Sequence, residues 1–79
     1  GMCMRTIIGI GHRQYVNKTG KQVSGYNVYV TYEDKNTSGL CCEREWVNDE
    51  TMESSGVAVG DTVEFLYNKY GRVDSIRPC

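Results

Sequence analysis

The segment 26–33 alternates apolar and polar residues with a period of two. Successive side chains of a β-strand point to opposite faces, so this pattern predicts a strand with one buried side and one exposed side. Val28 and Val30 belong to the apolar side of the alternation. Tyr29 is therefore expected to point outward from the middle of the strand.

Four further segments have extended character. Residues 4–16 are rich in β-branched and aromatic residues but contain Gly9 and Gly11, which predicts one long strand bent at a bulge or a barrel corner. Extended sequence returns at 40–47, 62–67 and 72–77. The polar, glycine-containing segments 17–21, 34–39 and 68–71 between them predict turns.

The β pattern is interrupted at 48–56, where a short helix is expected. Asn48 or Asp49 can cap its start, acidic residues fill its first turn, and Gly56 can end it. The chain then reads as strand, strand, strand, helix, strand, strand. This order predicts an all-β fold, a five-stranded OB-like barrel with one short helix between strands 3 and 4. An SH3-like barrel is the alternative, although it lacks a helix at that point.

The chain of 79 residues is expected to form one domain over residues 2–79, with Gly1 a remnant of a cleaved tag. A core of this size stabilises a fold only weakly, which favours a homodimer or higher homo-oligomer. No apolar run is long enough for a membrane span or a signal peptide, so no membrane association and a cytoplasmic location are expected.

The four cysteines do not have the spacing of a metal site. Cys3 and Cys79 lie near the ends of the chain, and Cys41 and Cys42 are adjacent, so no metal is expected. Since neighbouring strand residues face opposite sides, one of the adjacent thiols is expected in the core and the other outside.

Catalytic motifs are also missing. His12 is the single histidine and has no motif around it, and the sequence contains no phosphate-binding glycine loop. We therefore expect no enzyme activity, no catalytic residue and no cofactor.

Aromatic and basic residues occur close together in several places. Proteins bind single-stranded nucleic acid by stacking bases on aromatic rings while Lys and Arg contact the phosphates. The pattern predicts a non-enzymatic single-stranded DNA-binding protein, with RNA as a second possible strand. The expected binding residues are Tyr15, Tyr29, Trp46, Tyr70, Arg13, Lys18, Lys21, Arg44, Lys69 and Arg72. The formal net charge of −1 speaks against a uniformly basic surface. The charges are uneven along the chain, however, with a balance of +3 over residues 1–40 and −4 over residues 41–79, so one side could still be basic.

The layout, and in particular the tail 59–77 with its V-G-D-T-V entry into a strand, resembles the small single-stranded DNA-binding proteins of phages and mobile elements, including the filamentous-phage helix-destabilising family. The resemblance implies a dimer whose tyrosine-bearing and lysine-bearing loops grip single strands. By location it implicates Tyr29, Tyr70, Lys18, Lys21, Lys69 and Arg72. The near-neutral charge and the acidic helix depart from that family.

Two alternatives stay open at this point. The same barrel could be a protein-protein interaction module that binds no nucleic acid, using an edge strand or its Tyr and Trp side chains. In the segment 40–47, either Leu40, Cys42 and Trp46 or Cys41 and Val47 could face the core, because charged residues interrupt both rows.

Overall fold

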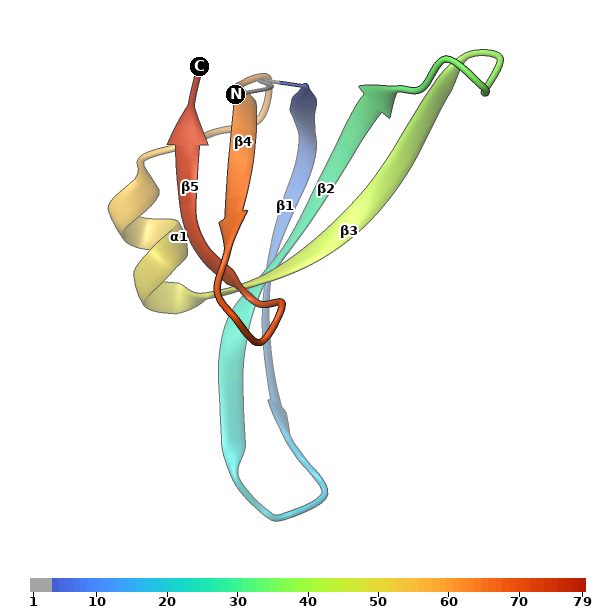
Figure 1. Ribbon diagram of the computed structural model, residues 1–79. Helices are drawn as coiled ribbons and strands as arrows, with labels where there is room; N and C mark the ends of the chain where they lie inside the picture. Colours follow the sequence, from blue (N-terminus) through green and yellow to red (C-terminus); the bar gives the residue numbers. More distant parts are fainter. Residues whose placement is uncertain (1–3) are drawn as a thin grey trace.

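The computed structural model describes residues 4–79 (Figure 1). The predicted tag remnant Gly1, the start at Met2 and the terminal Cys3 lie outside the described residues. The elements are β1 (Arg5–Val16), β2 (Gln22–Glu33), β3 (Leu40–Asn48), α1 (Asp49–Ser55), β4 (Thr62–Tyr67) and β5 (Val73–Pro78). All strands pair antiparallel in one sheet, in the order β3-β2-β1-β4-β5. The prediction of an all-β fold with one short helix between the third and fourth strands is confirmed.

The long first strand is bent as expected. Its pairing with β2 shifts register between Ile7 and Gly9, which is a β-bulge at Ile8. Only its first residues, Arg5 and Thr6, also pair with β4. Beyond Arg13, where β3 no longer pairs with β2, β1 and β2 continue as a two-stranded arm that projects from the rest of the molecule (Figure 1), and the molecule measures 42 × 25 × 24 Å.

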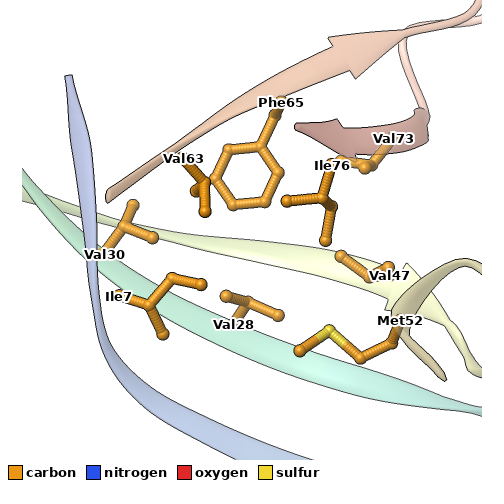
Figure 2. Close-up of a cluster of buried hydrophobic side chains, with 9 residues drawn as sticks. All are labelled: Ile7, Val28, Val30, Val47, Met52, Val63, Phe65, Val73 and Ile76. Carbon is orange, nitrogen blue, oxygen red and sulfur yellow. The ribbon is translucent and has the colours of Figure 1, made fainter. Parts of the chain in front are cut away.

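The core lies inside the curved sheet, between the side chains of β4 and β5 and those of β1, β2 and β3 (Figure 2). Every strand contributes to it, and α1 contributes Met52 at one end. Burying one such aliphatic side chain stabilises the fold by about 1.5–3 kcal/mol. The core consists of Ile7, Val28, Val30, Val47, Met52, Val63, Phe65, Val73 and Ile76.

The helix begins and ends at the predicted residues. Asn48 is the N-cap, and its side-chain oxygen accepts a hydrogen bond from the Thr51 amide at 2.7 Å. Gly56 ends the helix with φ of 69°, in the left-handed region that glycine adopts at low cost.

No backbone ladder joins the two edge strands, β3 and β5, within residues 4–79. Side chains cross the open side instead. The Tyr67 hydroxyl on β4 donates a hydrogen bond to Glu45 on β3. Arg5 lies 3.7 Å from a Glu43 carboxylate oxygen and 3.8 Å from the centre of the Tyr32 ring. Polar contacts therefore link β3 to β1 and β4 where strand pairing does not.

The register of β3 is now defined. Val47 is buried, so its row, which includes Cys41, faces inward, while Trp46 and Cys42 belong to the outward row. The prediction that one adjacent cysteine is a core residue is wrong: Cys41 is only half-buried and Cys42 is exposed. The reason is position, since this end of the β2–β3 hairpin extends past the core, away from β4 and β5 (Figure 1).

Candidate nucleic-acid interface

The outward rows of β1, β2 and β3 together form one surface, which we call the outer face. Strand alternation and the register of the sheet place six side chains with ring, guanidinium or amide groups on it. Two cross-strand pairs establish the arrangement: Asn27 lies opposite Trp46, and Tyr29 lies opposite Arg44. The six side chains of the outer face are Arg13, Tyr15, Asn27, Tyr29, Arg44 and Trp46.

The Trp46 ring packs over a glycine of β2. A Cβ built at Gly25 would lie 2.5 Å from Trp46 Cζ2, so the ring occupies the space that any other residue would fill. The ring also meets the Tyr15 ring in an edge-to-face arrangement, with 6.0 Å between the ring centres. Tyr15 is 52% exposed, so the pair is open to solvent. We call the Tyr15 and Trp46 rings together the ring wall.

Tyr29 packs in the same way on the bulged part of β1. A Cβ at Gly9 would lie 3.3 Å from its Cδ2 atom. The Tyr29 ring remains 37% exposed, as the alternation of β2 predicted. Glycine thus supports a ring at two places on the outer face.

A surface hollow lies at the centre of the outer face. It is lined by Arg13, Gln14, Tyr15, Asn27, Arg44 and Trp46, and we call it the Trp46 hollow. Two guanidinium groups and two aromatic rings therefore border one site. A guanidinium suits phosphate or carboxylate oxygens, and a ring suits a planar apolar group, so the hollow can accept a ligand that has both.

The charges of β3 are separated between its two faces. Arg44 points outward, whereas Glu43 and Glu45 lie in the inward row and contact Arg5 and Tyr67. The net charge of −1 therefore does not describe the outer face. The outward row of β2 contains one acidic residue, Glu33, at the end of the strand.

The remaining predicted binding residues lie on two turns. Lys18 and Lys21 are exposed at the tip of the β1–β2 arm, where Asn17 Oδ1 accepts hydrogen bonds from the Thr19 and Lys21 amides at 3.0 Å. The structure does not place these lysines beside the Trp46 hollow, because the arm carries them past the core (Figure 1).

The β4–β5 turn adjoins the outer face through Arg72. Arg72 lines a second hollow with Trp46 and the acidic Glu45, between the turn and the edge of β3. Lys69 instead lies over the Tyr70 ring, with its Nζ atom 5.2 Å from the ring centre. Of the predicted residues on this turn, Arg72 therefore adjoins the outer face, whereas Lys69 and Tyr70 form their own exposed pair.

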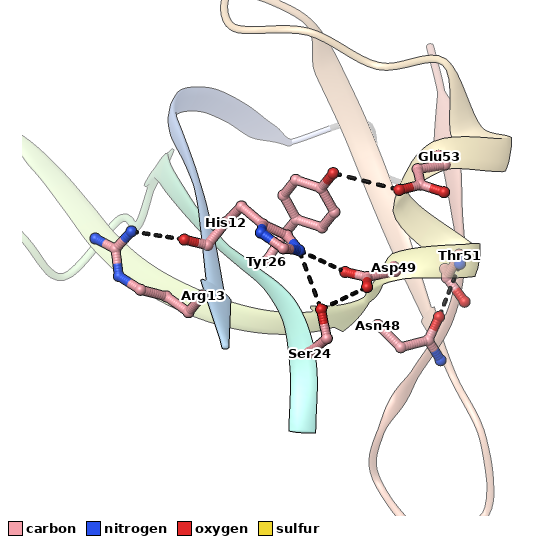
Figure 3. Close-up of polar contacts among 8 residues, drawn as sticks. All are labelled: His12, Arg13, Ser24, Tyr26, Asn48, Asp49, Thr51 and Glu53. Carbon is pink, nitrogen blue, oxygen red and sulfur yellow. Dashed lines mark hydrogen bonds and ion pairs between the residues drawn. The ribbon is translucent and has the colours of Figure 1, made fainter. Parts of the chain in front are cut away.

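His12 belongs to a separate polar cluster, on the inner side of the arm (Figure 3). Its Nε2 atom lies 3.1 Å from both Ser24 Oγ and an Asp49 carboxylate oxygen, while the Ser24 hydroxyl donates to the other Asp49 oxygen at 2.6 Å. The same nitrogen contacts both partners, so the histidine does not stand between serine and aspartate as a catalytic relay requires. The cluster ties the start of α1 to β1 and β2.

Three tyrosines beside acidic groups, Tyr26, Tyr32 and Tyr67, have pKa values raised above the ordinary 10.0. Partial burial, together with Glu53 and Asp49, raises the pKa of Tyr26, whose hydroxyl lies 3.5 Å from a Glu53 oxygen. Burial and the hydrogen bond to Glu45 raise the pKa of Tyr67. The hydroxyls of Tyr26 and Tyr67 both donate hydrogen bonds to these carboxylates.

No group of three or more His, Cys, Asp or Glu side chains in residues 4–79 is placed to hold a metal ion. None of the helices in this part of the chain is both long and apolar enough to cross a membrane. No protein-family model, curated protein or solved structure matches the chain.

Sequence reasoning missed three residues of this site, Gln14, Asn27 and Gly25. Asn27 shares the outward row with Tyr29, so the alternation of β2 could have identified it. The role of Gly25 depends on the register between β2 and β3, which no sequence signal specified.

Proposed function

We propose that the protein binds single-stranded DNA, without catalysing a reaction, and that the outer face is the surface that it uses. The observation that supports this most strongly is the Trp46 hollow, in which Arg13, Arg44, Tyr15 and Trp46 meet. Rings can stack on unpaired bases while the guanidinium groups contact phosphates. One strand can use stacking and phosphate contacts together only if the rings and the guanidinium groups lie side by side, as they do in this hollow.

The surroundings of the hollow extend the proposed path of the strand. Tyr29 continues the aromatic surface along β2, and Arg72 adds a cation at the edge of β3. In OB-type folds, oligonucleotides bind on the strand 2–3 face and on the loops between strands 1 and 2 and strands 4 and 5. The corresponding turns carry Lys18 and Lys21 on one side and Lys69 on the other. RNA is a second candidate strand, because stacking and phosphate contacts do not require a deoxyribose.

Assembly, origin and location are part of the same proposal. The edges of β3 and β5 offer backbone groups for pairing with a second copy, which suits a homodimer or higher oligomer. The resemblance in layout to phage and mobile-element proteins suggests a role on exposed single strands in the cytoplasm.

A protein partner is the second candidate ligand. The unpaired edge of β3 begins at Leu40, which is 62% exposed, and an extended peptide could add a strand there. This surface is distinct from the Trp46 hollow, so the two functions predict different sensitive residues.

The experiment that tests the proposal is a titration of Trp46 fluorescence with oligothymidine and with a matched duplex, at low and moderate salt. Binding through the outer face predicts quenching by the single strand that weakens as salt rises, because phosphate contacts release counterions. Absence of any response at micromolar concentrations would contradict the proposal and favour a protein partner.

A further inference from the structure

We infer that Asn27 reads the edge of one base in the Trp46 hollow, and that adenine is the base it favours. This inference rests on the proposed function, since it assigns a specificity to the same surface.

Asn27 lies at the centre of the outer face. Its cross-strand neighbours are Trp46 on β3 and Gly11 on β1. Because Gly11 has no side chain, the Arg13 guanidinium occupies the space above it, where a Cβ would lie 3.2 Å from Arg13 Nη1. The amide group therefore lies between the Trp46 strand position on one side and this guanidinium on the other. Asn27 also lines the Trp46 hollow, together with Arg13 and Arg44. A base stacked in the hollow would have its edge within reach of this amide.

The Asn27 side chain has no structural task that accounts for it. It is half-buried, yet it forms no side-chain hydrogen bond within residues 4–79. Three other asparagines, in contrast, accept backbone amide hydrogen bonds: Asn17 and Asn68 in turns, and Asn48 at the helix cap. Asparagine is disfavoured in the interior of a strand. Asn27 therefore presents a free donor and a free acceptor to the hollow at a position where the fold alone would favour another residue.

The chemistry of the carboxamide suits a base edge. Its oxygen accepts one hydrogen bond and its amino group donates two, side by side in one plane. Adenine offers the complementary pair in its N7 acceptor and N6 amino donor, and Asn forms this bidentate pair with adenine in protein–DNA complexes. In this arrangement the ring wall holds the base by stacking, the two arginines hold the flanking phosphates, and Asn27 pairs with the adenine edge.

Such a contact has a predictable size. A good bidentate pair discriminates against the wrong base by about 1–3 kcal/mol, which corresponds to about five- to 150-fold in affinity. Because the hollow is open to water, we expect a preference near the lower end, about fivefold.

The test measures the affinity of the protein for short oligothymidines in which the central base is A, C, G or T. Fluorescence anisotropy of the labelled strand reports binding. The variants are Asn27→Ala and, because threonine favours strands, Asn27→Thr, with Asn36→Ala as the matched control. Asn36 lies exposed in the β2–β3 turn and is not a lining residue of the Trp46 hollow. Circular dichroism confirms that each variant is folded.

The expected result is a preference of about fivefold for the adenine-containing strand in the wild type and in Asn36→Ala, with loss of the preference but retained oligothymidine binding in both Asn27 variants. Equal affinity of the wild type for all four strands would overturn the role of Asn27 and leave the proposed function intact. A preference that survives in the Asn27 variants would overturn it as well. If no strand binds at all, the proposed function fails first, and the role of Asn27 fails with it.

Discussion

The Trp46 ring occupies the space above Gly25, where a Cβ would come within 2.5 Å of Cζ2. The same Cβ would lie 2.8 Å from the Val47 carbonyl oxygen, which belongs to the backbone and cannot swing aside. The ring wall of the outer face thus depends on the absence of a side chain on the neighbouring strand.

The substitution Gly25→Ala should therefore destabilise the protein and displace Trp46. Overpacking of this kind costs about 1–3 kcal/mol of unfolding free energy. The matched control is Gly11→Ala, because the atom nearest to its new Cβ, at 3.2 Å, is Nη1 of the flexible Arg13 side chain. Urea unfolding followed by tryptophan emission should show a large decrease in stability for the first variant and a change within about 0.5 kcal/mol for the second. Equal decreases would contradict the described packing of Trp46.

The cap of α1 gives a second prediction. Replacing Asn48 by Ala removes the acceptor for the Thr51 amide and should lower the unfolding free energy by about 1 kcal/mol. In a domain of this size that corresponds to a fall in Tm of about 4–8 °C. The control Asn36→Ala changes the same residue type in an exposed turn and should leave Tm nearly unchanged. Thermal unfolding followed by circular dichroism measures both, and an unaffected Asn48→Ala would rule out the cap.

Alkaline pH should destabilise the protein through Tyr67. Its pKa is raised above the ordinary 10.0, so above pH 10 the unfolded chain loses this proton while the folded chain retains it. The stabilisation from the Tyr67–Glu45 hydrogen bond is complete below pH 10 and declines as the pH rises further. The variant Tyr67→Phe should show a shallower decline, measured by urea unfolding across this pH range.

A part of the alkaline decline should persist in Tyr67→Phe. The pKa values of Tyr26, raised by partial burial, and of Tyr32, raised by its hydrogen bond to Glu43, are shifted in the same direction. Tyr70→Phe is the control, since the Tyr70 hydroxyl has no hydrogen-bond partner in the described part of the chain. Identical slopes for the wild type and Tyr67→Phe would mean that the bond to Glu45 does not contribute.

The salt dependence of binding should identify which cations bind phosphates. For single strands, the slope of log affinity against log salt changes by about 0.7 for each phosphate that the protein no longer neutralises. Arg13→Ala should therefore reduce the slope by about 0.7, because Arg13 lines the Trp46 hollow. Anisotropy titrations at several salt concentrations measure the slope. An unchanged slope with weakened affinity would instead assign Arg13 a packing role.

The strands and the helix were predictable because local signals define them. The alternation around Val28 identified β2 and the exposure of Tyr29, and Asn48 with Gly56 bracketed the helix. The register of β3 was not predictable, since Glu43 and Arg44 interrupt both of its rows. Only pairing with β2 decides between them, and pairing is a long-range property.

The candidate site was predictable as residue types and less so as an arrangement. Ring and basic residues on the outward rows of β1, β2 and β3 converge, because the register aligns them. The lysines of the two turns do not converge, because the length of the arm and the direction of each turn depend on the whole fold. The sequence pattern did not identify Asn27, because one polar residue in a strand is common and only its neighbours on β1 and β3 set it apart.

Charge reversal at Arg44 tests most directly whether the outer face binds single strands. Arg44→Glu places an acid beside the Trp46 hollow, whereas Lys35→Glu makes the same charge change in the β2–β3 turn, outside the residues that line it. Anisotropy titrations of a labelled oligothymidine at low salt should show at least about tenfold weaker binding for the first variant, the equivalent of about 1.4 kcal/mol, and a much smaller change for the second. Equal weakening by both variants, or wild-type protein that binds no single strand, would contradict the account.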